Sequence, residues 1–244
     1  MSLTITLATT RRILAQLRRD HRTLGLLILV PSLLMVLLRY VLDAPGAFDR
    51  FGPVLMGVFP FVVMFVVTSV GTLRERTSGT LERLMTTPLG KLDLLLGYAL
   101  AFGVTALVQA AVVGTIALTW LGLDLRGPTW TLFLMTLLDG WLGMALGLFA
   151  SAFARTEFQA VQFMPAFALP QLLLAGLFVP REQMSVGLRW ASDVMPLTYA
   201  VDAMQQLTRH ADITGTLVRD AVVIASCMLL ALVLGAATLR RRTA

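Results

Sequence analysis

Residue types that build catalytic and metal centres are scarce in this chain of 244 residues. It contains one cysteine, Cys227, which excludes a disulfide within the chain and argues against a thiolate metal site. The one lysine, Lys91, stands in the sequence LGKL, and neither a GxxxxGKS nor a GxxxxGKT phosphate loop occurs. There is no GxSxG motif, and no histidine or second aspartate is placed to form a hydrolase site within an apolar segment. We therefore expect no catalytic and no metal-binding residue, and no ATP hydrolysis by this chain alone.

Extended polar stretches are also scarce. Hydrophobic residues make up 57% of the chain, above the roughly 45–50% apolar content of soluble domains, and the mean hydropathy is +0.80. Taking about 20 apolar residues per crossing, we predict membrane-spanning segments at residues 24–42, 51–73, 94–121, 129–153, 160–179 and 218–239. Lipid cannot pair the open edges of strands, and barrel strands would be shorter and alternating. The predicted fold class is therefore an all-α membrane protein with six transmembrane helices.

The distribution of arginines predicts the orientation in a cell membrane. With an even number of crossings, three clusters fall on one side: Arg11, Arg12, Arg18, Arg19, Arg22; Arg74, Arg76, Arg83; and Arg240, Arg241, Arg242. The positive-inside rule puts that side, with both termini, in the cytoplasm. The two histidines, His21 and His210, then fall on opposite sides, which argues against a shared metal or catalytic pair. This topology also accounts for the net charge of +6 without a nucleic-acid partner.

We expect a single membrane domain over residues 1–244, made of three parts. In residues 1–23, Leu3, Leu7, Leu14 and Leu17 recur at helical spacing beside the arginines. This pattern predicts an amphipathic helix that lies in the cytoplasmic interface; the alternative is a solvated start whose arginines only set the topology. Residues 24–239 form the six-helix part, and residues 240–244 form a basic cytoplasmic tail.

The turn at residues 74–93 is strongly hydrophilic. Thr77 or Ser78 is suited to cap a short helix that Pro88 would end. We expect one face of this helix to be apolar, with Leu81, Leu84 and Met85. The other face would be charged, with Glu82 and Arg83. The pattern predicts a short amphipathic cytoplasmic helix, which either docks a soluble partner or is simply a solvated charged surface.

Asp139 is the most unusual residue within the apolar segments, because an intramembrane charge is costly unless it is paired or faces a cavity. Gly143 and Gly147 follow at intervals of four residues, so all three share one face of the fourth helix, which is typical of close helix packing. Arg39 in the first segment is a candidate counter-charge. A proton relay is the competing interpretation, but no second carboxylate or buried histidine accompanies Asp139. We therefore predict a membrane-packing role for these four residues.

Two separated motifs resemble a known family. The first motif, residues 74–89, reads RERTSGTLERLMTTPL. The second motif has two parts: residues 174–180 read LAGLFVP, and residues 195–204 read MPLTYAVDAM. The first motif is similar to the cytoplasmic coupling region after the second helix in permease subunits of type 2 ATP-binding-cassette (ABC) exporters of bacteria. The second is similar to the short external re-entrant helices that precede the last crossing in that family. The resemblance covers nearly the whole chain.

The resemblance implies that the chain is the transmembrane permease domain of an ATP-driven exporter. Two copies, or this chain and a paralogue, would form the path, and separate ATPase subunits would bind ATP and Mg, so that this chain would hold no cofactor. Members of the family export drugs, antibiotics, lipids or polysaccharides. The implied ATPase-docking residues are Glu75, Ser78, Gly79, Thr80, Glu82, Arg83, Leu84 and Pro88. The implied path follows the second and fifth helices, with the candidate lining residues Phe61, Phe65, Gln162, Phe163 and Phe167.

Two other functions stay open at this point. An ion-coupled secondary transporter would need coupling-ion groups near the midplane and usually an internal repeat, and neither is evident beyond Asp139. A non-transporting membrane anchor or sensor would pair with a partner without moving a substrate.

Overall fold

The structure is a computed structural model that describes residues 3–42, 46–79 and 90–238. Within these ranges the regular secondary structure is entirely helical, which confirms the predicted all-helical class. The helices are α1 (Leu3–Arg19), α2 (His21–Val41), α3 (Ala47–Thr77), α5 (Lys91–Thr115), α6 (Thr129–Ser151), α7 (Glu157–Leu174), α8 (Val186–Val194), α9 (Pro196–Arg209) and α10 (Gly215–Thr238). A π-helical turn, η1 (Ile116–Trp120), extends α5, and a 3-10 turn, η2 (Arg181–Gln183), precedes α8.

Five helices of the described ranges are long and apolar enough to cross a membrane. Their spans are Thr23–Val41, Ala47–Thr77, Leu92–Trp120, Thr129–Ser151 and Gly215–Thr238. The sixth predicted segment, 160–179, corresponds to α7, which ends at Leu174 and contains Pro165 and Pro170. Its glutamines and prolines lower its hydropathy, so the structure supports five crossings and the sixth stays a prediction.

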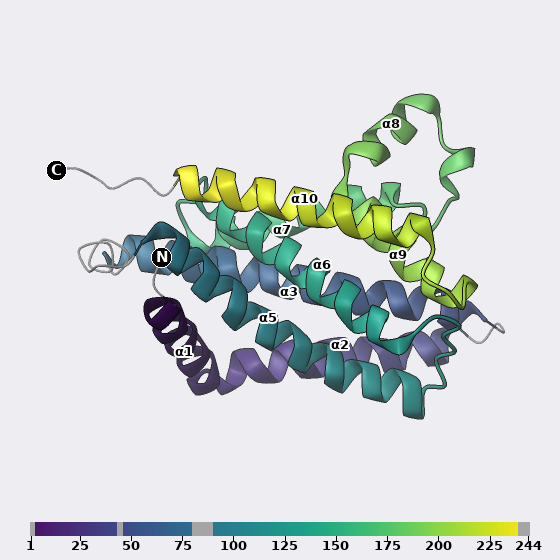
Figure 1. The fold of residues 1–244 in the computed structure, drawn as a ribbon, viewed down its shortest axis with the longest axis horizontal. Helices are drawn as coiled ribbons and strands as arrows, with labels where there is room; N and C mark the ends of the chain where they lie inside the picture. The colour runs from purple at the N-terminus through teal and green to yellow at the C-terminus, as the bar shows by residue number, and fades with distance from the viewer. Residues whose placement is uncertain (1–2, 43–45, 80–89, 239–244) are drawn as a thin grey trace.

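The long helices run roughly side by side and give the molecule two ends (Figure 1). One of them, named here the α1 end, holds α1, the C-terminal ends of α3, α6 and α10, and the starts of α5 and α7. The opposite end, named the α9 end, holds α8, α9 and the start of α10. Chain segments far apart in sequence therefore meet at each end.

Helix α3 is the centre of the fold and packs most closely against α6. A Cβ atom at Gly143 would collide with the carbonyl oxygen of Phe61, and one at Gly147 would collide with that of Phe65. Phe65 follows Phe61 by four residues on α3, and Gly147 follows Gly143 by four residues on α6. The two helices therefore run parallel with their backbones touching, as small residues allow within a membrane. The backbones of α3 and α6 are therefore in direct contact at these two positions.

Helix α1 lies against α5 through threonines rather than leucines. Thr6, Thr9 and Thr10 are buried together with Ile13, whereas Leu3 and Leu7 are exposed. Thr9 sits where a side chain at Gly97 would be, so the glycine permits the close approach. The helical prediction for the leader agrees with α1, and its placement in a membrane interface stays a prediction.

Candidate functional site

Three consecutive residues at the C-terminal end of α3 contact four other helices, and the first of them contacts α7. Arg74 Nε donates to Glu157 Oε1 at 2.6 Å, and Arg74 Nη2 donates to Glu157 Oε2 at 2.7 Å. This bidentate hydrogen bond lowers the pKa of Glu157. Since Glu157 is the first residue of α7, the pair connects the end of α3 to the start of α7.

Glu75 connects α3 to two more helices. Its Oε1 pairs with Arg12 Nη1 of α1 at 3.0 Å, and its Oε2 accepts a hydrogen bond of 2.5 Å from the hydroxyl of Tyr98 in α5. The Glu75 side chain is 13% exposed and Tyr98 is buried. Poor access to water strengthens both contacts relative to a surface ion pair.

Arg76 completes the set. Its Nη1 donates to the carbonyl oxygen of Ser151 at 2.8 Å, and Ser151 is the last residue of α6. A cation on a terminal carbonyl satisfies an unpaired acceptor and is favourable against the helix dipole. We call Arg74, Glu75 and Arg76 the α3 clamp, because together they hold the end of α3 to α1, α5, α6 and α7.

The predicted docking residues follow or overlap the α3 clamp. Glu75 faces Arg12 and Tyr98 inside the chain, Ser78 is the C-cap of α3, and Gly79 has a φ of 68°, which lets the chain leave the helix. The other predicted docking residues lie outside the described residues: Thr80, Glu82, Arg83, Leu84 and Pro88. Docking on this segment stays a prediction.

The structure brings only some of the predicted path residues together. Phe61 and Phe65 are fully buried, with ring centroids 6.4 Å apart, and the Phe65 ring lies 6.2 Å from that of Phe167 on α7. Phe163 packs in a separate small cluster near the end of α3, and Gln162 is exposed. Phe61 and Phe65 are therefore interior residues in this conformation.

The predicted ion pair between Arg39 and Asp139 is not formed, and that prediction was wrong. Arg39 Nε donates to the carbonyl oxygen of Leu121 at 3.0 Å. Asp139 is fully buried against Gly57 of α3 and Met204 of α9, and its carboxylate oxygens have no hydrogen-bond partner among the described residues. The reason is that α2 packs against α5, η1 and α3, whereas the Asp139 face of α6 is turned toward α3 and α9.

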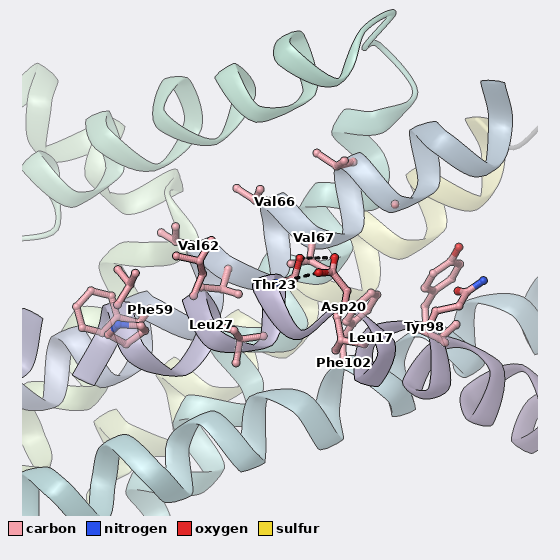
Figure 2. Close-up of a pocket in the computed structure, with 18 of the residues that line it drawn as sticks. Leu17, Asp20, Thr23, Leu27, Phe59, Val62, Val66, Val67, Tyr98 and Phe102 are labelled. Carbon is pink, nitrogen blue, oxygen red and sulfur yellow. Dashed lines mark hydrogen bonds between the residues drawn. The ribbon is translucent and has the colours of Figure 1, made fainter. Parts of the chain in front are cut away.

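An apolar groove between α2 and α3 was not predicted from the sequence (Figure 2). Its volume is about 1020 Å³. Leucines and valines of both helices line it, and its α1 end is closed by polar side chains that include Asp20, Thr23 and Tyr98. Side chains that line a groove between helices have the same composition as side chains that face lipid, so no sequence pattern distinguishes them.

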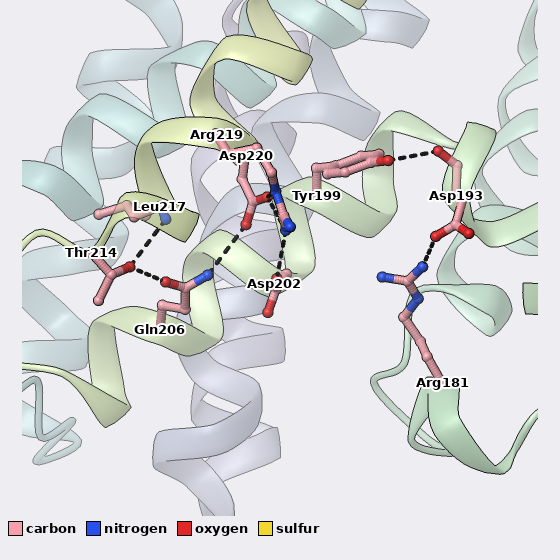
Figure 3. Close-up of polar contacts among 9 residues, drawn as sticks. All are labelled: Arg181, Asp193, Tyr199, Asp202, Gln206, Thr214, Leu217, Arg219 and Asp220. Atoms are coloured by element: carbon pink, nitrogen blue, oxygen red, sulfur yellow. Dashed lines mark hydrogen bonds and ion pairs between the residues drawn. The ribbon is translucent and has the colours of Figure 1, made fainter.

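A polar network at the α9 end was also missed (Figure 3). The fully buried Asp220 accepts a hydrogen bond of 2.7 Å from Arg219 Nη2 and one of 3.3 Å from Gln206 Nε2. Arg219 also lies 3.6 Å from Asp202 of α9. The network ties the start of α10 to α9. No sequence pattern singled out Arg219 or Asp220, which lie at the start of the predicted segment 218–239.

Comparisons with known proteins identify a family. The family model described as ABC-2 type transporter matches residues 4–208. ABC transporter G family member 20 of Dictyostelium discoideum is 28% identical over 159 residues, which are 65% of this chain and 22% of that protein. The probable multidrug ABC transporter permease YbhR of Escherichia coli (strain K12) is 27% identical over 155 residues, 64% of this chain and 42% of that protein. The probable multidrug ABC transporter permease YbhS of the same strain is 27% identical over 158 residues, which are 64% of this chain and 42% of that protein. The aligned part thus spans less than half the length of each of these relatives.

Proposed function

Because the chain belongs to the ABC-2 type transporter family, we propose that it is the membrane-spanning permease subunit of an ATP-driven exporter. Two such subunits form the translocation path, and separate ATP-binding-cassette subunits, which bind ATP and Mg, supply the force. The α3 clamp is the observation that carries this proposal, since it links the segment expected to meet the ATPase to four helices of the membrane domain.

The proposed mechanism is mechanical transmission through α3. Closure of the ATPase subunits on ATP displaces the segment that follows Gly79, and α3 carries the displacement into the membrane. Because Gly143 and Gly147 hold α6 against α3, these two helices move as a unit. When α3 moves, α1, α5 and α7 must either move with it or lose the contacts that Arg12, Tyr98 and Glu157 make with the α3 clamp. Such a linked set of packed helices is the kind of two-state element that a ligand-driven switch needs.

We infer that the α1 end faces the cytoplasm. The short connections and chain ends expected at the α1 end carry more arginines than the connections at the α9 end. The positive-inside rule places the arginine-rich side in the cytoplasm. This orientation places the α3 clamp where a soluble ATPase can reach the segment that follows it. It also places the Arg219 network on the outer side.

The path is proposed to run along α3 and α7 between the two permeases. Phe158, Phe167 and Leu173 of α7 are exposed in the single chain, which leaves their side chains available to a second copy or to a substrate. The name of YbhR, a probable multidrug permease, and these exposed apolar side chains favour efflux of amphiphilic organic compounds. Antibiotics, lipids and polysaccharides are the other cargo classes within the proposal.

Co-purification and reconstitution test the proposal. A tagged chain is expected to retain an ATPase subunit that contains a phosphate loop, identified by mass spectrometry, and the complex should hydrolyse ATP in vesicles while the chain alone should not. Export that needs no ATPase subunit and stops when the proton gradient is dissipated would instead establish a secondary transporter. Co-purification without any effect of the chain on ATP hydrolysis would favour a membrane anchor or sensor.

A further inference from the structure

We propose that the groove between α2 and α3 binds one anionic phospholipid, with an acyl chain in the groove and the headgroup at the α1 end. The lipid is a bound component of the folded protein rather than cargo. The site depends on the fold alone and not on the proposed ATPase partnership.

The dimensions of the groove fit an acyl chain. The apolar part of its lining on α3 runs from Leu55 to Gly71, about 24 Å at a helical rise of about 1.5 Å per residue. This apolar length and a volume of about 1020 Å³ leave room for a flexible hydrocarbon chain.

The groove has one polar end and one apolar end, as a phospholipid has. The lining at the α9 end is apolar and includes Leu34, Leu55 and Phe59, whereas the polar lining residues gather at the α1 end. These polar residues are Gln16, Asp20, Thr23, Arg74, Glu75 and Tyr98. A molecule with one polar end and one apolar end matches this arrangement (Figure 2).

The charged lining residues at the polar end are Asp20, Glu75 and Arg74, and the arginines next to them in α1 give their surroundings an excess of positive charge that favours an anionic headgroup. Residues 11–22 contain five arginines and one aspartate. Arg18 and Arg19 are exposed and stand in the chain between Leu17 and Asp20, which both line the groove. The Nη2 atom of Arg12 is buried without a hydrogen-bond partner among the described residues, although Arg12 contacts the lining residue Glu75. Clusters of arginine beside a membrane-spanning helix attract anionic lipids.

Gly71 offers a direct test because it lines the groove and has space around it. A Cβ atom at Gly71 would meet no described atom within 4 Å, so the backbone position accepts a side chain and Gly71→Leu adds bulk at the groove. Gly25 on α2 has equally open surroundings but does not line the groove. Gly25→Leu is the matched control, because both substitutions replace a helical glycine by the same helix-favouring residue.

The wild type, Gly71→Leu and Gly25→Leu are each reconstituted in vesicles that contain phosphatidylglycerol and phosphatidylcholine in equal amounts. Each protein is then purified in detergent, and the lipid that it retains is measured by native mass spectrometry. We expect about one phosphatidylglycerol per chain in the wild type and in Gly25→Leu, and at least a fivefold loss in Gly71→Leu. Equal retention in all three proteins, or equal retention of the two lipids by the wild type, would overturn the proposal. So would a Gly71→Leu variant that changes only the oligomeric state, because a second copy would then occupy the groove.

A second measurement needs no variant. Wild-type protein is irradiated with phosphatidylglycerol that carries a photoreactive group in its acyl chain, and the modified peptides are mapped. Adducts should concentrate on residues 58–71 of α3 and on the facing residues of α2. Adducts spread evenly over α3 and the exposed Leu229, Leu230 and Val233 of α10 would contradict a specific site.

Discussion

The hydroxyl of Tyr98 in α5 donates a hydrogen bond of 2.5 Å to Glu75, near the end of α3. The same carboxylate pairs with Arg12 of α1 at 3.0 Å. A single side chain thus joins three helices just before the segment that is proposed to meet the ATPase. Movement of that segment cannot leave these helices unaffected while both contacts hold.

Removing the Tyr98 hydroxyl should weaken the transmission of force. A hydrogen bond to a charged group contributes about 1.5–3 kcal/mol, so we expect Tyr98→Phe to insert normally but to lower ATP-dependent export several-fold. Export is measured in vesicles that contain the complete complex. Tyr40→Phe is the matched control, since Tyr40 is 71% exposed on α2 and should leave export unchanged. Equal export by both variants would mean that the contact has no part in coupling.

Charge reversal at Glu82 should separate ATP hydrolysis from export. Glu82 lies in the predicted coupling helix, where an oriented charge contact to the ATPase is expected. We predict that Glu82→Arg keeps its expression and membrane insertion, and that ATP hydrolysis by the complex continues without export. Glu182→Arg makes the same charge change at an exposed position of η2, near the α9 end, and should behave as the wild type. Wild-type export by a well-folded Glu82→Arg protein would rule out this role.

The contact between α3 and α6 should tolerate no side chain at Gly143. An added methyl group would meet the carbonyl of Phe61, and overpacking of this kind costs about 1–3 kcal/mol, occasionally more. We expect Gly143→Ala to lower the melting temperature in detergent by several degrees. Gly25→Ala, with no described atom within 4 Å of the new methyl group, should leave the melting temperature unchanged or raise it. Similar melting temperatures for the two variants would show that the helices can separate without cost.

Two buried aspartates should respond in opposite ways to the same substitution. Asp139 has no hydrogen-bond partner among the described residues, whereas Asp220 is bound by Arg219 and Gln206. Asp139→Asn removes an unpaired acid and should keep or raise the melting temperature, with export intact in the presence of a proton uncoupler. Asp220→Asn weakens the Arg219 network and should lower the melting temperature. Loss of export in Asp139→Asn with unchanged stability would reveal a transport role for this residue.

The parts of the fold that depend on local pattern could be predicted from the sequence. Long apolar runs identified the all-helical membrane class, and two motifs identified the family. The four-residue spacing of Asp139, Gly143 and Gly147 predicted one close-packing face, and the structure places both glycines against α3. The count of six crossings was not confirmed, because the glutamines and prolines of α7 reduce its hydropathy.

The parts that depend on contacts between distant residues could not be predicted. Arg12, Tyr98 and Glu157 have no local feature that marks them as partners of the α3 clamp. The Arg39–Asp139 pairing failed because depth in the membrane alone does not determine which helix faces which. The groove along α3 could not be recognised because its valines are identical in type to valines that face lipid.

The central claim is that the segment after α3 lies on the cytoplasmic side, within reach of an ATPase. It is tested most directly by labelling Glu82→Cys in a Cys227→Ala background with a membrane-impermeant maleimide. We expect labelling in inside-out vesicles and none in spheroplasts, with the reverse result for Glu182→Cys. Labelling of Glu82→Cys from the outside of intact spheroplasts would contradict the claim.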